Sequence, residues 1–302
     1  MKKIFFILLV SMISFWGCEY FENSTTINSS SLELNITGLP QLSDTLTYVA
    51  WFDNDDRPPV FIKQLSPNEQ GNVFFKEEQK LSYLDSAQTF LVTVERKSQL
   101  NSPNFTASSR IVLSGRFTNG ICNLALGENF KDFSQTTAKY TLYTPTDGDS
   151  LSNPFGGIWF VDSIDARKVV AGLNIPVLFA GWIYEGWIEI AGNKLSTGRF
   201  RNPKAADLFN GYSATAASIP FPGEDFINNA PSGFTFPLNL RGAKSYISLQ
   251  INDGSTRGNV PGIILFEANI PGDAVSLKSY SMTLKNVSFP KGTAVIKVDL
   301  LK

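Results

Sequence analysis

Two short acidic segments hold the side chains with the clearest capacity for chemistry. Asp53-Asn54-Asp55-Asp56 offers the oxygen ligands that calcium prefers, and Glu224-Asp225 is a carboxylate pair of the kind used in general acid–base catalysis. The first segment lacks the spacing of an EF-hand loop, so we expect a solvated hairpin turn there. The second lies in a loop bounded by Gly and Pro, whereas glycoside hydrolysis needs carboxylates that face each other across a cleft. We therefore expect no metal site and no catalytic pair in these segments.

The chain has few other groups for catalysis or metal binding. It contains no histidine, which removes the usual general base and the commonest transition-metal ligand. Its two cysteines are Cys18 and Cys122. Cys122 lies in an alternating apolar pattern, so we expect a small buried hydrophobe rather than a reactive thiol. These absences predict a protein that is not an enzyme and that uses neither a cofactor nor a metal.

The N-terminus has the parts of a secretory signal. Two lysines precede an apolar run at residues 4–13, which is shorter than the roughly 20 residues of a membrane-spanning helix. Gly17-Cys18 then resembles the bacterial lipobox, although Phe15 and Trp16 are bulkier than its usual residues. The resemblance implies a signal peptide at residues 1–17 and a diacylglycerol on the Cys18 thiol. The alternative is an ordinary signal peptide followed by an incidental cysteine.

This signal sets the expected location and partners. We expect a lipid-anchored protein of the cell envelope, held in the outer membrane on its periplasmic or its surface face. Residues 18–31 are rich in Ser, Thr and Asn and predict a flexible lipidated linker. Without the two signal lysines, 24 basic residues stand against 27 acidic ones, a formal charge of −3. That charge does not suit nucleic acid, which requires a basic face.

The rest of the chain predicts strands. It carries 24 Phe, 9 Tyr and 5 Trp together with 23 Gly and 16 Pro, a composition typical of strands joined by tight turns. Strand signals begin at residues 32–36, where apolar and polar residues alternate with period two. Further strands are predicted at residues 46–52, 89–95, 110–117, 139–143, 157–161, 182–190, 245–251, 263–268, 280–284 and 294–300. Amphipathic helical patterns of a dozen residues are missing. We therefore predict an all-β protein.

Three motifs of the N-terminal half recur in the same order in the C-terminal half. Residues 34–40 recur as 173–176, residues 48–51 as 184–187, and residues 87–94 as 243–250. Three matches in one order favour an internal duplication. We expect two β-sandwich-like domains related by that duplication, at residues 32–135 and 136–302.

The second motif, Tyr-x-x-Trp, supplies candidate ligand contacts. Side chains at i and i+3 of a strand point to opposite faces. Glu185 and Glu189 share a face with Trp187, which predicts a wet face with that indole partly exposed or covered by a loop. Trp51, Trp187 and Tyr184 are therefore candidate ligand-contact aromatics. The alternative for all three is packing inside the sandwich.

Two segments carry a family resemblance. Gly181–Ile188, followed by Leu195–Phe200, resembles the extracytoplasmic C-terminal domain of anti-sigma-K-type factors, and residues 39–51 look like a more diverged copy. Residues 221–231 resemble envelope lipoproteins of Bacteroidota that carry this domain. The resemblance implies a β-sandwich-like sensor or adhesion module. It does not carry over sigma-factor inhibition, because the sequence shows neither the cytoplasmic helical domain nor a transmembrane helix.

The expected function is that of a non-catalytic, extracytoplasmic binding or structural module that recognises an envelope protein or polymer. The first alternative is a glycan-binding accessory lipoprotein that stacks exposed Trp and Tyr on sugar rings, which buried Trp51 and Trp187 would weaken. A third is a hydrolase built on carboxylates, which needs two acidic side chains facing each other in a deep pocket.

Overall fold

The computed structural model describes residues 27–54, 56–79, 87–127, 130, 132–150, 152–165, 168–214 and 219–300. The expected signal peptide, Cys18 and most of the expected linker lie outside these residues. The fold is all-β, as predicted. Its helices are three short 3₁₀ segments, η1 (Lys97–Gln99), η2 (Pro145–Ser150) and η3 (Asn286–Ser288). No helix in the described part of the chain has the length and apolarity needed to cross a membrane.

The first sheet is antiparallel and nearly closed on itself. Its strands lie in the order β3 (Arg57–Leu65), β2 (Leu46–Asn54), β5 (Thr89–Arg96), β6 (Ile111–Thr118), β7 (Ile121–Leu126), β19 (Lys291–Leu300), β1 (Ile27–Thr37) and β4 (Val73–Glu78). The edge strands β3 and β4 are bridged by a Lys63–Glu77 ion pair of 2.8 Å.

The second sheet follows the same plan. Its order is β14 (Asn193–Phe200), β13 (Trp182–Ile190), β16 (Lys244–Ile251), β17 (Ile263–Asn269), β18 (Ser279–Leu284), β8 (Thr137–Leu142), β9 (Gly157–Trp159) and β15 (Gly223–Asp225). The short β12 (Leu173–Asn174) also pairs with β8, and β10 (Val161–Asp165) pairs with β11 (Lys168–Ala171) as a separate hairpin.

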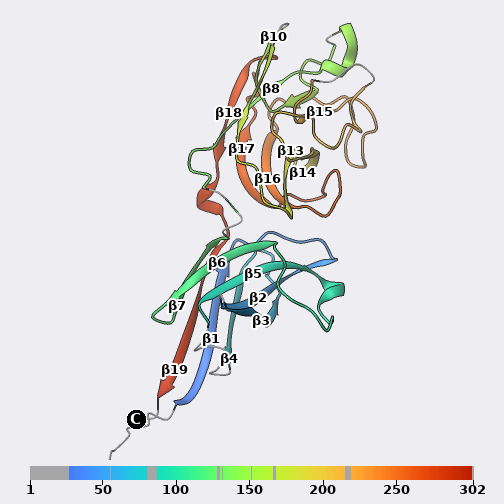
Figure 1. The fold of residues 1–302 in the computed structure, drawn as a ribbon. Helices are drawn as coiled ribbons and strands as arrows, with labels where there is room; N and C mark the ends of the chain where they lie inside the picture. The colour runs from blue at the N-terminus through green and yellow to red at the C-terminus, as the bar shows by residue number, and fades with distance from the viewer. Residues whose placement is uncertain are drawn as a thin grey trace, which may run out of the picture.

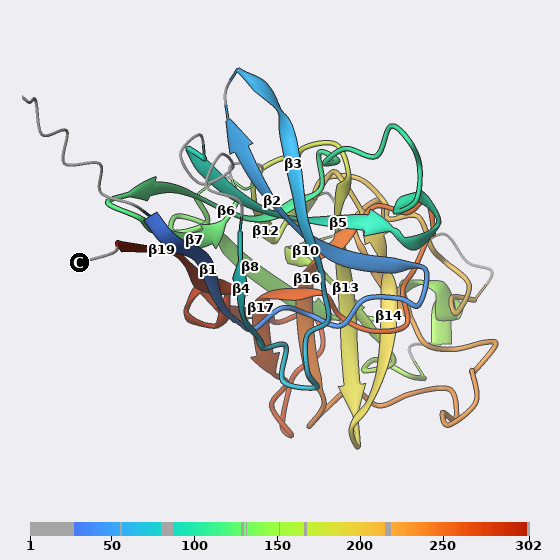
Figure 2. The same cartoon turned by 90° about the horizontal axis from the view of Figure 1, so that it is seen from below.

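The last strand corrects the expected domain boundaries. β19 lies between β7 and β1 of the first sheet, not in the second domain predicted at residues 136–302. The second domain, residues 137–284, is thus inserted into the first, which consists of residues 27–127 and 291–300 (Figure 1). Viewed from below, β1, β7 and β19 lie together (Figure 2). The alternating pattern of residues 294–300 predicted a strand but carried no information about which sheet receives it.

The structure bears out the internal similarity of the two halves. A β-bulge precedes Trp51 in the β2–β3 ladder and Trp187 in the β13–β14 ladder. A second bulge precedes Thr93 in the β5–β6 ladder and Ser248 in the β16–β17 ladder. Bulges re-aim one side chain and are features of a particular fold rather than accidents. Their coincidence supports the predicted duplication.

The third sequence match needs a correction of one residue. Trp51 pairs with Leu91, and Trp187 pairs with Tyr246, so Leu91 corresponds to Tyr246. The match of 87–94 with 243–250 had instead aligned Phe90 with Tyr246. A one-residue slip moves every side chain to the other face of the sheet. The aromatic identity had suggested the wrong register.

The strand that pairs with the first repeat motif, residues 34–40 or 173–176, comes from a different end of the chain in each domain. In the first domain Ala294 of β19 lies between Leu34 and Cys122. In the second domain Ala138 of β8 lies between Leu173 and Met282. The same structural position is therefore filled by the last strand of one domain and the first strand of the other.

Cys122 is buried, as its sequence pattern predicted. It lies in the main core, and burial raises the pKa of its thiol to about 11. The backbone of Gly115 packs against it, since a Cβ at Gly115 would lie 2.8 Å from the Cys122 Sγ. A thiol that stays protonated and enclosed in this way is inert.

Candidate functional site

The two motif tyrosines fasten the start of each domain. Tyr48 and Tyr184 are almost fully buried. The hydroxyl of Tyr48 donates to the carbonyl oxygen of Pro40, and that of Tyr184 to the carbonyl oxygen of Pro176, both over 2.7 Å. Each bond spans eight residues and holds the loop before β2 or β13 against the strand. Tyr184 therefore serves the fold, and its predicted ligand contact is wrong.

The two motif tryptophans are equally internal. Trp51 and Trp187 are both completely buried. The indole N–H of Trp51 donates to Thr93 Oγ1 over 2.8 Å, and that of Trp187 to Ser248 Oγ over 2.9 Å. Buried indole N–H groups usually find such partners. The packing alternative holds for both residues, and the prediction that they touch a ligand is wrong.

The face that holds Trp187 is not wet, and the alternative of a covering loop is the one that the structure shows. Glu185 is fully buried, and Arg199 Nε donates to its carboxylate over 3.0 Å. Ser196 and the backbone N–H of Gly258 also donate to it. Gly258 belongs to the β16–β17 connection, which covers this face. The sequence indicates a charged residue here but does not indicate the loop that encloses it.

The Glu224-Asp225 pair is buried in β15 rather than exposed across a cleft. Asp225 accepts hydrogen bonds from Trp159 Nε1 over 2.8 Å and from Thr146 Oγ1 over 2.6 Å. Glu224 accepts one from Ser213, while its Oε2 atom is buried with no partner. Burial, together with the charge of nearby Asp207, raises the pKa of Glu224 to about 8. These contacts hold the β14–β15 connection in place.

The acidic segment 53–56 forms the β2–β3 hairpin, as predicted. The backbone N–H of Asp56 donates to Asn54 Oδ1 over 3.0 Å, an Asx turn. Asp55 lies outside the described residues. Within the described ranges, no group of three or more Cys, Asp or Glu side chains is placed to hold a metal ion.

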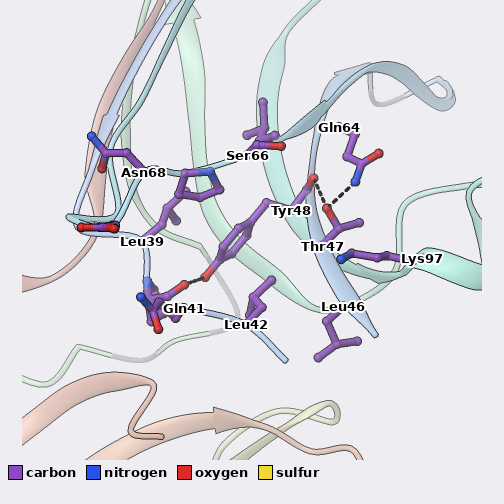
Figure 3. A pocket seen from close by; sticks show the side chains of 14 residues that line it. Leu39, Gln41, Leu42, Leu46, Thr47, Tyr48, Gln64, Ser66, Asn68 and Lys97 are labelled. Atoms are coloured by element: carbon purple, nitrogen blue, oxygen red, sulfur yellow. Dashed lines mark hydrogen bonds between the residues drawn. The ribbon is translucent and has the colours of Figure 1, made fainter. Parts of the chain in front are cut away.

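A surface pocket opens where the first domain faces the second. It has a volume of about 340 Å³ and lies between the 39–46 loop and the end of β3 (Figure 3). Tyr48 forms its floor through the bond to Pro40, and Gln64 Nε2 donates to Thr47 Oγ1 at its wall over 3.0 Å. The exposed lining is polar, with Gln41, Ser66, Asn68, Glu69 and Lys97.

Two further pockets each share a lining residue with this one and include residues of the second domain. One, of about 340 Å³, lies between Thr45, Leu46, Arg96, Ser98 and Arg110 on one side and Ile251, Asp253 and Ser255 on the other. The other, of about 420 Å³, lies between Gln41 and a wall of Glu189, Lys194, Lys244, Tyr246, Val260, Pro261, Gly262 and Ile264. Leu46 lines the first and second of these pockets and Gln41 the first and third, so the three pockets are neighbours on the surface. We call them together the junction groove.

The charge of the groove is positive. Its five cationic residues are Arg96, Lys97, Arg110, Lys194 and Lys244, and its three acidic residues are Glu69, Glu189 and Asp253. Asp253 is already bound by Arg199 over 2.5 Å, and Glu189 by Lys194 over 3.2 Å. The groove therefore differs from the chain as a whole, whose formal charge is −1.

Sequence reasoning did not find this groove. Its walls come from the 39–46 loop, the ends of β5 and β16, and the β16–β17 connection. The repeat motifs that overlap these segments predicted strands and turns but no shared surface, and the docking of one domain on the other brings the segments together. The comparisons with known proteins add no candidate, because no family model and no curated protein matches the chain.

Proposed function

We propose that this protein is a lipid-anchored, non-catalytic binding module of the cell envelope, and that its ligand lies in the junction groove. The observation that carries the proposal is the contrast between the motif aromatics and the groove. Tyr184, Trp51 and Trp187 are enclosed by the fold, whereas polar and cationic side chains of both domains line the junction groove.

A site between domains is physically reasonable. Ligands bind preferentially where two domains meet, because both can contribute contacts to an enclosed surface. Here the chain passes twice between the domains, before β8 and before β19, so the two walls of the groove are doubly connected. A doubly connected pair loses less freedom on closing around a ligand than a pair joined by one flexible linker.

The likeness to the anti-sigma-K C-terminal domain fits such a module and remains part of the proposal. The glycan-binding alternative needs a different contact mode from the one that the sequence suggested. Stacking on Trp51 or Trp187 is not available, so a sugar would be held by hydrogen bonds and charge. The hydrolase alternative loses support, because Glu224 and Asp225 are enclosed in packing.

Site-specific photo-crosslinking in intact cells tests the groove. A photoreactive residue at Gln41, shared by two of the pockets, is expected to give discrete adducts. The same residue at Phe74, a 70% exposed position on edge strand β4, is the control and is expected to give none of those adducts. Identical adducts at both positions, or none at Gln41, would contradict the proposal.

The anchor is tested separately. Cys18→Ser is expected to remove metabolic labelling by a fatty acid and to shift the protein from the membrane fraction to the soluble envelope fraction. Cys122→Ser is the matched control and is expected to keep both. A membrane-bound, unlabelled Cys18→Ser protein would disprove the lipid anchor while leaving the groove prediction intact.

A further inference from the structure

We propose that the junction groove binds an acidic polysaccharide, whose carboxylate or sulfate groups are held by Arg96 and Arg110. This inference rests on the proposed function and adds the chemical class of the ligand. Arginine suits the task because its planar, permanently charged guanidinium matches carboxylate and sulfate oxygens with two parallel donors.

The two arginines stand at one corner of the first sheet. Arg96 ends β5 and is exposed, and Arg110 directly precedes β6. The backbone carbonyl of Arg110 accepts from Val94 N over 3.0 Å, which fixes the two segments side by side. Among the described residues, the Arg110 guanidinium makes one long hydrogen bond, of 3.5 Å, to the Val94 carbonyl oxygen.

Neither guanidinium has a carboxylate partner within the described residues. Asp253 shares their pocket, but it is occupied by Arg199 and by the backbone N–H of Ser255. Two cations without a carboxylate partner among the described residues thus line one pocket. An anion that enters the pocket would find these donors unused.

The internal repeat shows that the fold does not require these charges. Arg96 pairs with Leu46, the first residue of β2, and Ile251 pairs with Trp182, the first residue of β13. Arg96 therefore corresponds to Ile251. Val94 corresponds to Leu249 in this register. Because Arg110 bonds to Val94 and Ile263 pairs with Leu249, Arg110 corresponds to Ile263. The sister domain thus fills both positions with isoleucine. The arginines are an addition specific to the groove side of the first domain.

The neutral lining favours a sugar chain. The groove presents amide and hydroxyl side chains, among them Gln41, Gln64, Ser66, Asn68, Ser98 and Ser255. Such groups both donate and accept, as sugar hydroxyls require. A peptide that adds a strand would instead use the β3 edge, where Pro58 and Pro59 lack the backbone N–H groups that pairing needs.

Affinity measurements on the purified folded part test the ligand class. We expect polygalacturonate or alginate to bind, with affinity that falls as salt is raised. Neutral dextran and poly-glutamate are the comparison ligands and are expected to bind at least about tenfold more weakly. Equal binding of poly-glutamate would replace the sugar with an acidic peptide, and equal binding of dextran would remove the role of charge. Either result overturns the inference.

Substitution by the sister domain's own residue tests the arginines. Arg96→Ile together with Arg110→Ile is expected to weaken polyuronate binding at least about tenfold, since two charge-assisted hydrogen-bond donors are lost. The matched control, Arg57→Ile with Lys168→Ile, removes the same charge at exposed positions outside the groove and is expected to stay within about twofold. Unchanged circular dichroism and melting temperature establish that both variants fold.

Wild-type affinity in the double arginine variant would overturn the assignment of these residues. Failure of the inference is distinguishable from failure of the proposed function. If polyuronates do not bind but Gln41 still crosslinks specifically in cells, the groove keeps its role and only the ligand class is wrong.

Discussion

The hydroxyl of Tyr48 donates to the carbonyl oxygen of Pro40 over 2.7 Å, eight residues back along the chain. Tyr184 and Pro176 repeat this relationship with the same separation and the same distance. A phenol ring that is buried while its hydroxyl binds a loop carbonyl fixes the entry of the chain into the strand. In the first domain this loop is also one wall of the junction groove.

Removing either hydroxyl should lower stability without disturbing the core. Tyr48→Phe and Tyr184→Phe keep the ring but leave a carbonyl oxygen without its donor. We expect each to lower the free energy of unfolding by about 1–2 kcal/mol. Chemical denaturation measures the change, and Tyr143→Phe, at a half-buried ring, is the control. No difference between Tyr48→Phe and the control would contradict the fastening role.

The hydroxyls of Thr93 and Ser248, which accept from the two buried indoles, are expected to contribute comparably to stability. Thr93→Val leaves the Trp51 indole N–H buried without an acceptor and removes a 2.6 Å donor to Glu95. Ser248→Ala likewise leaves the Trp187 indole N–H buried without its acceptor. We expect a loss of about 1–3 kcal/mol for each, measured by denaturation with tryptophan emission as the probe. Thr118→Val, at the exposed end of β6, should change little.

Buried carboxyls predict a stability that falls as pH rises. Burial raises the pKa of Asp207 to about 7 and of Glu224 to about 8, above the usual values near 4. Between about pH 4 and pH 8 the unfolded chain therefore releases protons that the folded chain keeps, which favours unfolding. We expect the free energy of unfolding to fall across this window.

Glu224→Gln tests the source of that dependence. The amide cannot ionise, so the variant should lose less stability than the wild type between pH 5 and pH 8, by at least about 1 kcal/mol. Glu78→Gln, at an exposed position of β4, is expected to follow the wild-type profile. A parallel profile for Glu224→Gln would show that this carboxyl does not control the pH dependence.

Gly198 lies in β14, where its backbone conformation and its neighbours leave room for glycine alone. Its φ is +129°, and a Cβ there would lie 2.8–3.0 Å from the carboxyl group of Asp207. That carboxyl accepts the backbone N–H of Gly223 over 3.0 Å. We expect Gly198→Ala to cost about 2–3 kcal/mol in thermal or chemical unfolding. Gly272→Ala, which meets open space, should be nearly neutral, and equal effects would refute the argument.

Local patterns predicted local structure well. Strand patterns in the sequence located eleven strands but missed β3, β4, β7 and β14, and the recurrence of Tyr-x-x-Trp predicted a repeated fold. The same patterns could not predict enclosure by distant loops. Glu185 gave the signal of a solvated strand because nothing in its neighbourhood encodes the Gly258 loop that covers it.

The sequence could not predict which sheet receives β19 or where the groove lies, for a related reason. Ala294 belongs beside Leu34 and Cys122, partners that lie more than 150 residues away in the chain. The proposed role of Arg96 depends on residues of the second domain that line the same pocket. Both facts depend on how complete domains pack, which residue spacing does not express.

The insertion of one domain into the other sets the order in which the molecule can be completed. Among the described strands the ribosome supplies β19 last, yet that strand lies between β7 and β1. The inserted domain has all of its strands well before then, whereas the first sheet stays open until the final ten residues of the described chain arrive. Chains shortened by translation errors or proteolysis before residue 291 lack the strand that pairs with β1, so the edge of β1 that carries Leu34 is left open to proteases.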